Sequence, residues 1–218
     1  MRIRDLFDRI TNKPKAGDVK IACIGDSITY GYGVRHRLRC SYPAVLGDLL
    51  GEGYFVRNFG FSGRTASREG DHPYFVERLY RKSLLFLPDI AVIMLGTNDA
   101  KPFNWRGADA FLKDLEAMIV SYRTLPSHPD IILLVPPPVW AYKGPKVWYD
   151  IDPQILENEL CPAVRRLAAE EGLPLVDLND KNTWTPDLFR DGVHPNVAGA
   201  RHLAESVFKA IHTKELSV

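Results

Sequence analysis

The stretch VKIACIGDSITYGYG, residues 19–33, decides how the rest of the chain can fold. Residues 19–24 form a short apolar run rich in β-branched side chains, which is typical of a strand buried on both faces of a parallel sheet. The run stops at Gly25, and Ser27 follows two residues later. Open α/β sheets bind ligands at the carboxyl ends of their strands, so the hydroxyl of Ser27 is the first candidate for chemistry. The alternative is that Ser27 caps the following helix, because serine is a preferred N-cap residue.

Apolar runs and helical patterns alternate along the rest of the chain. Runs typical of buried strands cover residues 19–24, 54–59, 90–95, 131–135 and 173–178. Helical spacing of apolar residues covers residues 42–50, 73–86, 108–125, 156–171 and 195–211. Strands that alternate with helices predict right-handed crossovers and a mostly parallel sheet covered on both faces. For five strands the flavodoxin-like order 2-1-3-4-5 is expected.

The length of the chain, 218 residues, fits one domain spanning residues 1–218. Apolar side chains at positions 3, 6, 7 and 10 predict an amphipathic helix within residues 1–12, which is expected to dock on the domain or on a second subunit of a homo-oligomer. This segment lacks the continuous apolar core of a secretion signal, so we predict a cytoplasmic protein. No membrane span is expected, because no run approaches the roughly 20 apolar residues that a transmembrane helix needs.

Charge and metal-ligand patterns exclude several kinds of partner. The net charge is +1, with 28 basic and 27 acidic residues, which offers no electrostatic argument for binding nucleic acid or an anionic membrane. The three cysteines are widely spaced and form no C-x-x-C pair, and the six histidines show no metal-binding motif. We therefore expect no metal and no cofactor.

The segment DGVHP, residues 191–195, supplies two groups that could activate a serine. Acyl transfer through a serine needs a base to accept its proton and a group to orient that base. A turn at Gly192 can bring the carboxylate of Asp191 onto a ring nitrogen of His194, which leaves the other nitrogen facing Ser27. The same pattern also fits a turn at a helix start that carries a surface histidine.

Donors for an oxyanion follow the first three predicted strands. The expected strand order brings Ser27, Gly60 and Asn98 to one edge of the sheet, where the N–H groups of Ser27 and Gly60 and the amide of Asn98 could act together. Gly60 also fits a plain turn glycine, and Asn98 an Asx turn. We expect Asp26 and Asp99 to brace their loops by accepting backbone N–H groups.

Four segments carry a resemblance to a known family. They are Gly25-Asp26-Ser27-Ile28-Thr29, Asn58-Phe59-Gly60-Phe61-Ser62-Gly63, Gly96-Thr97-Asn98-Asp99 and Asp191-Gly192-Val193-His194-Pro195. Together they resemble the ordered blocks of the SGNH, or GDSL-type, hydrolases, with isoleucine in place of the family's leucine after the serine. The resemblance implies a three-layer α/β/α fold. It also implies Ser27 as nucleophile, His194 as base, Asp191 as its orienting acid, and Ser27, Gly60 and Asn98 as the oxyanion hole.

The loop over residues 139–152 favours a sugar ester as the small-molecule substrate. It contains the aromatic residues Trp140, Tyr142, Trp148 and Tyr149, and flat aromatic side chains stack well on sugar rings. These residues could instead pack the loop onto the core or onto a dimer partner. Arg64 is a candidate for binding a substrate carboxylate, with a surface arginine as the alternative.

Three functions from two classes remain open for this sequence. The first is a serine esterase that releases acetate or another short acyl group from an O-acetylated sugar. The second is a lysophospholipase or acyl-thioesterase, which would act on longer acyl chains. The third is a doubly wound module that binds a flavin or nucleotide without catalysis, although the chain has no Walker A motif and binding alone does not require Asp191 and His194 together.

Overall fold

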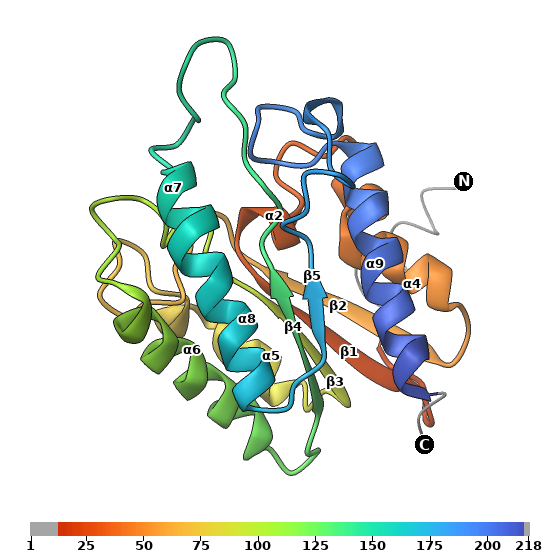
Figure 1. Cartoon of the computed structure of the whole chain (residues 1–218). Coiled ribbons are helices and arrows are strands. Elements are labelled where there is room, and N and C mark those ends of the chain that lie inside the picture. The colour runs from red at the N-terminus through yellow and green to blue at the C-terminus, as the bar shows by residue number, and fades with distance from the viewer. Residues whose placement is uncertain (1–12, 216–218) are drawn as a thin grey trace.

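The computed structural model describes residues 13–215 of the chain, so the predicted helix over residues 1–12 lies outside it. Five strands form one parallel sheet with the order β2-β1-β3-β4-β5, which confirms the order expected from the sequence (Figure 1). The strands are β1 (Val19–Gly25), β2 (Tyr54–Gly60), β3 (Ile90–Met94), β4 (Asp130–Val135) and β5 (Leu175–Asp177).

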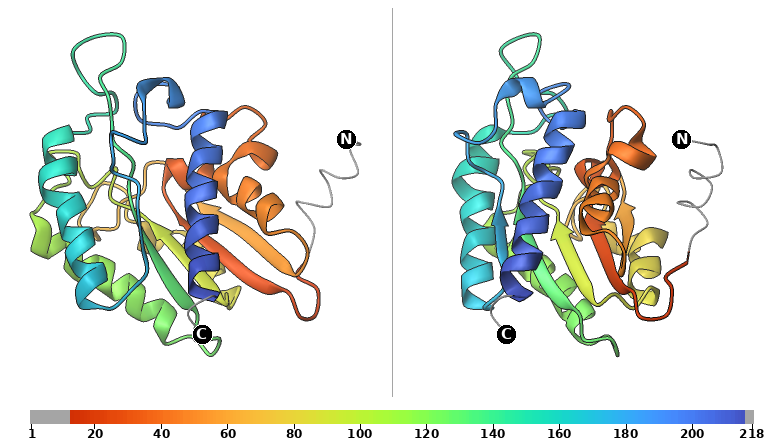
Figure 2. Two further views of the ribbon diagram at one scale, coloured as in Figure 1. Left: turned by 45° about the vertical axis from the view of Figure 1, so that its right-hand side comes forward. Right: turned by 90° about the vertical axis from the view of Figure 1, so that its right-hand side faces the viewer.

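Helices cover both faces of the sheet, which produces the expected α/β/α layers (Figure 2). One face carries α4 (Tyr42–Leu50) and α9 (Val197–Glu215). The other face carries α5 (Arg78–Leu85), α6 (Ala108–Arg123) and α8 (Cys161–Glu170). Alternate side chains of β1 point to opposite layers, because Ile21 and Cys23 pack in the α4/α9 core whereas Ala22 and Ile24 pack in the other. Because both faces of β1 are covered in this way, all four of these positions are apolar.

The helix predicted over residues 73–86 is divided in the structure. A 3₁₀ turn, Tyr74–Val76, precedes α5, and Glu77 between them is extended with φ −77° and ψ 146°. Tyr74 donates its backbone N–H to the carbonyl of Thr65 and its hydroxyl to the carbonyl of Phe59. These tertiary hydrogen bonds hold the segment against the loop after β2 and override its helical pattern.

The helix predicted over residues 156–171 starts earlier and contains a wider turn. It begins with α7 (Pro153–Ile155), where the side chain of Asp152 accepts the Gln154 N–H, and passes through a π-helical turn, Leu156–Leu160, into α8. Pro162 follows this turn and has no N–H to offer the preceding carbonyls, which suits a local change of hydrogen-bond register.

The carboxyl ends of β1, β2 and β3 lie at one edge of the sheet. Gly25 pairs with Gly60 on one side and with Met94 on the other, so the loops that follow these strands start at the same level. The short helices α2 (Ser27–Tyr30) and α3 (Arg37–Cys40) leave the sheet from this edge. Within residues 13–215 no helix is long and apolar enough to cross a membrane.

Candidate active site

The hydroxyl of Ser27 is free for chemistry because another residue caps its helix. Asp26 is the N-cap of α2, and its carboxylate accepts the Ile28 N–H at 2.9 Å. Ser27 is the first residue of α2 and is only 6% exposed. The alternative in which Ser27 itself caps the helix is therefore wrong. Gly25 allows this sharp turn, since a Cβ there would overlap the side chain of Thr29 and the carbonyl of Met94.

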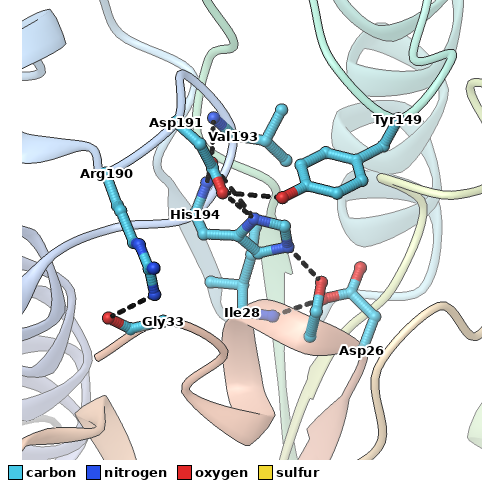
Figure 3. A network of polar contacts seen from close by, with 9 residues as sticks. Asp26, Ile28, Gly33, Tyr149, Arg190, Asp191, Val193 and His194 are labelled. Atoms are coloured by element: carbon cyan, nitrogen blue, oxygen red, sulfur yellow. Dashed lines mark hydrogen bonds and ion pairs between the residues drawn. The ribbon is translucent and has the colours of Figure 1, made fainter. Parts of the chain in front are cut away.

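A chain of hydrogen bonds joins Ser27, His194 and Asp191, and Figure 3 shows the part of it between His194 and Asp191. The Oγ atom of Ser27 lies 2.9 Å from Nε2 of His194. The Nδ1 atom of His194 lies 2.9 Å from Oδ2 and 3.1 Å from Oδ1 of Asp191. All three side chains are buried, so the arrangement predicted from the sequence is present with the geometry of a nucleophile, a base and an orienting acid.

Asp191 is held as a carboxylate by several donors. Its Oδ1 accepts the backbone N–H groups of Val193 and His194, and its Oδ2 accepts the hydroxyl of Tyr149 at 2.9 Å. Burial by itself raises the pKa of Asp191, but hydrogen bonds from the ring and backbone of His194, the charge of that ring and the Tyr149 hydroxyl outweigh it and lower the pKa to about 2. Asp191 is therefore ionised throughout the neutral range.

The turn that carries Asp191 and His194 depends on Gly192. This residue has φ +81°, and a Cβ there would overlap the carbonyl oxygen of Trp140. The Trp140 N–H in turn donates to the Gly192 carbonyl at 2.8 Å. After His194, the side chain of Asn196 accepts the N–H groups that open α9, which fixes where the helix starts.

Two tyrosines that no sequence motif identified enclose the ring of His194. The ring of Tyr32 lies 4.6 Å from the imidazole, and the ring of Tyr149 meets it edge-on at 4.9 Å. Tyr149 was one of several aromatic residues in the loop over residues 139–152, but nothing in the sequence distinguished it from its neighbours. Only the tertiary structure shows that it contacts two members of the site.

Asn98 lies where the sequence predicted, at the cavity beside Ser27. Its Nδ2 donates to the carbonyl of Arg64 at 3.1 Å and lies 3.5 Å from Oδ2 of Asp26. The backbone carbonyl of Asn98 accepts Nδ2 of Asn104 at 2.9 Å, which ties its loop down. The side-chain amide is thereby oriented before any substrate enters.

The prediction that Gly60 contributes an oxyanion donor is wrong. The Gly60 N–H donates to the side chain of Asn58 at 2.8 Å and is not available to a substrate. Gly63, three residues later, lines the cavity instead, with φ +80°. Among residues 13–215 the N–H groups of Gly63 and Ser27 have no hydrogen-bond partner. Of the two glycines in this loop, Gly63 is therefore the one whose backbone lies at the cavity.

We expect Gly60→Ala to destabilise the fold. A Cβ at Gly60 would overlap the backbone of Thr29 and Tyr30, which cannot move aside as a side-chain end could. Overpacking of this kind costs about 3 kcal/mol, the upper end of its usual range. Thermal unfolding should show Tm lower by roughly 6–12 °C for a chain of this size. Gly47→Ala is the matched control, because its Cβ would make ordinary contact with Val56, and its Tm should stay the same or rise. If Gly60→Ala kept the wild-type Tm but had a reduced kcat, the result would instead support Gly60 as an oxyanion donor.

The residues predicted to bind substrate do not line the cavity. Arg64 donates to the carboxylate of Glu77 through Nε and Nη2 and to the Ser62 carbonyl through Nη1, so its guanidinium is already engaged. Trp140 packs against Phe189 at 4.8 Å between ring centres. Tyr142 and Trp148 contact each other farther out in the loop, and Trp148 is 41% exposed.

A cavity of about 200 Å³ opens beside the hydroxyl of Ser27. Its walls come from the loops after β1, β2, β3 and β5 and from the end of the loop over residues 139–152. They include Ser27, Gly63, Asn98, Lys101, Tyr149 and His194. Within residues 13–215 no cluster of three or more His, Cys, Asp or Glu side chains could hold a metal ion.

Two buried carboxyl groups underlie the cavity, as expected from the sequence. Burial raises the pKa of Asp26 to about 6, against the opposing effect of its hydrogen bond from Ile28 and the charge of His194. Burial also raises the pKa of Asp99 to about 7, although it accepts the N–H groups of Ser67 and Ala66. Both residues accept backbone N–H groups as predicted: Asp26 braces its own loop, whereas Asp99 braces the neighbouring loop after β2.

Comparison with known proteins finds similarity to esterases over most of the chain. An acetylxylan esterase from Xylanibacter ruminicola is 38% identical over 216 residues, which cover 91% of this chain and 44% of that protein. The chain therefore spans less than half the length of this relative. A structure of a carbohydrate acetylesterase family member from Sinorhizobium meliloti is 26% identical, with a TM-score of 0.70 over 89% of this chain and 97% of that one.

The aryl esterase of M. smegmatis shares the fold, with a TM-score of 0.70 at 22% identity over 89% of this chain and 98% of that one. Residues 23–202 match the GDSL-like lipase/acylhydrolase family, and this match includes every member of the hydrogen-bonded chain from Ser27 to Asp191. The protein belongs to the GDSL-like lipase/acylhydrolase family.

Proposed function

We propose that the protein is a serine esterase that releases a short acyl group, acetate in the first instance, from a carbohydrate ester. The observation that carries this proposal is the hydrogen-bonded chain from Ser27 through His194 to Asp191. A binding module for a flavin or nucleotide has no need of a buried serine hydroxyl held 2.9 Å from an imidazole nitrogen.

The reaction follows from the roles of these three side chains. His194 Nε2 accepts the proton of Ser27 as Oγ bonds to the ester carbonyl carbon, and Asp191 stabilises the charged ring. His194 then returns the proton to the leaving alkoxide oxygen as the ester C–O bond breaks, which leaves the acyl group on Ser27. Water, deprotonated by the same ring, attacks the acyl-enzyme and releases the carboxylic acid and the free Ser27 hydroxyl.

The charge that forms on the carbonyl oxygen needs donors in the same cavity. We propose that the N–H groups of Ser27 and Gly63 supply two of them. Nδ2 of Asn98 supplies the third, through the hydrogen whose contact with Asp26 is long, at 3.5 Å. All three are neutral, so they stabilise an oxyanion without giving up a proton to the nucleophile.

The size of the cavity favours a short acyl group over a lipid or long-chain thioester. A volume of about 200 Å³ is below the roughly 300–1,000 Å³ of pockets that enclose drug-sized ligands. The carbohydrate part of the proposal is supported by the names of two relatives and by exposed aromatic rings at the rim, where Tyr32 is 45% and Tyr149 is 40% exposed.

The test is hydrolysis of p-nitrophenyl acetate, butyrate and octanoate, followed by acetate release from acetylated xylan. We expect kcat/KM to fall by at least about tenfold from acetate to octanoate, because each misplaced methylene group costs roughly 1–3 kcal/mol. Acetate release from the polysaccharide should accompany this preference. A preference for octanoate would favour the lysophospholipase or acyl-thioesterase function, and hydrolysis of aryl acetates without release from any acetylated sugar would remove carbohydrate as the substrate.

A further inference from the structure

We propose that Tyr149 is a positioning residue of the esterase reaction, whose hydroxyl fixes the Asp191 carboxylate against the ring of His194. This inference rests on the proposed function, because it assigns a role to a residue that touches the base and the acid. Figure 3 shows the phenol lying beside the imidazole, with its hydroxyl directed at the carboxylate.

The contact places Tyr149 and His194 on the same oxygen. Oδ2 of Asp191 accepts both the Tyr149 hydroxyl and the Nδ1–H of His194, each at 2.9 Å. Oδ1 accepts two backbone N–H groups from the adjoining turn. Among the described residues, Tyr149 is the one side-chain donor to Asp191 from outside the turn that holds Asp191 and His194.

The backbone at Tyr149 adopts a costly conformation to reach this position. Tyr149 and Asp150 have φ values of +65° and +58°, and two consecutive left-handed residues with a Cβ are unfavourable. Burial does not repay this strain, since the Tyr149 side chain is substantially exposed. Strained backbone that persists at an exposed position beside a reactive site is a sign of functional constraint.

The loop that carries Tyr149 is attached to the site at both ends. Near its start the Trp140 N–H donates to the Gly192 carbonyl, within the turn between Asp191 and His194. At its end the Asp152 N–H donates to the Ala100 carbonyl, in the loop that holds Asn98. The strained turn at Tyr149 therefore lies between two anchors to the site.

The hydroxyl of Tyr149 acts as a permanent donor. Partial desolvation of the hydroxyl, together with the hydrogen bond to Asp191 and its charge, raises the pKa of Tyr149 well above its ordinary value, so the group stays protonated at neutral pH although much of the ring is exposed. It therefore limits rotation of the carboxylate and draws part of its negative charge away from the ring of His194. Among the described residues, Asp26 and Tyr32 are further ionisable groups near that ring, and Lys101 also lines the cavity.

The experiment is Tyr149→Phe, which keeps the ring contact with His194 and removes only the hydroxyl. We expect kcat on p-nitrophenyl acetate to fall about tenfold at nearly constant KM, the lower end for loss of a hydrogen bond to a charged group. The acid limb of the kcat/KM profile should move to higher pH, because the released carboxylate charge favours the protonated ring. The low-field ¹H resonance of the Asp191–His194 hydrogen bond should also shift, and this signal does not depend on turnover.

Tyr30→Phe is the matched control. Its ring lies over the guanidinium of Arg37, outside the cavity, and we expect its kinetics and its proton resonance to match the wild type. A wild-type kcat, pH profile and low-field signal in Tyr149→Phe would overturn the inference, as would an increase in KM alone, which would make Tyr149 a substrate contact. Ser27→Ala is measured alongside to test the proposed function separately. If Ser27→Ala is inactive, the esterase function stands even when the role of Tyr149 is disproved. If Ser27→Ala is active, the esterase function itself is disproved.

Discussion

Ser27→Ala is expected to lower kcat for p-nitrophenyl acetate by more than about 10⁴-fold, because loss of the nucleophile of a triad removes the acyl-enzyme route entirely. The fold should survive, since Asp26 and not Ser27 caps α2, and alanine fits the space of the serine. The measurement is steady-state kinetics together with thermal unfolding, which should give a Tm close to that of the wild type.

Ser206→Ala provides the control for this substitution. Ser206 lies in α9 and donates its hydroxyl to the carbonyl of His202, remote from the cavity, so its kcat should be unchanged. Wild-type turnover by a folded Ser27→Ala protein would show that another group attacks the ester, and would disprove the mechanism proposed for Ser27, His194 and Asp191.

Asn98→Ala is expected to reduce kcat by about 10²–10³-fold with little change in KM, as for other oxyanion donors. The amide bonds most strongly to an oxygen that carries charge, which exists only after Ser27 has attacked, so its loss affects the transition state more than the bound ester. Kinetics should be measured with short aryl esters, whose binding involves few other contacts.

Two observations separate this role from a structural one. Asn98 also donates to the Arg64 carbonyl, so Tm of the variant must be followed, and a moderate decrease is compatible with the role. Asn158→Ala removes an exposed amide whose one partner among residues 13–215 is Gln154 in the preceding turn, and it should change neither Tm nor kcat. A rise in KM at constant kcat would make Asn98 a residue that binds the substrate in its ground state.

The sheet could be predicted because its signals are local. Each strand is rich in apolar side chains and ends near a glycine, a proline or a polar loop, and the alternation with helices predicts a parallel sheet. The helix over residues 73–86 could not be divided from its sequence, because the break at Glu77 depends on contacts of Tyr74 with the loop after β2. Short-range periodicity contains no information about such contacts.

The site was predictable to the level of the segment and not always to the residue. Asn98, Asp191 and His194 lie in segments where only one side chain has the required chemistry, and Ser27 is the hydroxyl nearest the end of its strand. The loop after β2 has two glycines, and the choice between them depends on which N–H the side chain of Asn58 already occupies.

The remaining site residues depend on tertiary contacts that no sequence pattern encodes. The engagement of Arg64 depends on where the break before α5 places Glu77. The contact of Tyr149 depends on two left-handed residues in a long loop without periodicity.

The two anchors of the loop after β4 make its outer part exchangeable. Residues 143–147 project from the molecule (Figure 1). The hydrogen bonds of Trp140 to Gly192 and of Asp152 to Ala100 hold the two ends of the loop, so the outer residues are not needed to align the reacting groups. Insertions or replacements in that outer part can alter which alcohol portion of an ester is accommodated while the hydrolytic step is preserved. The outer part of the loop is therefore a position at which new contacts to the alcohol portion of an ester could be introduced without moving the reacting groups.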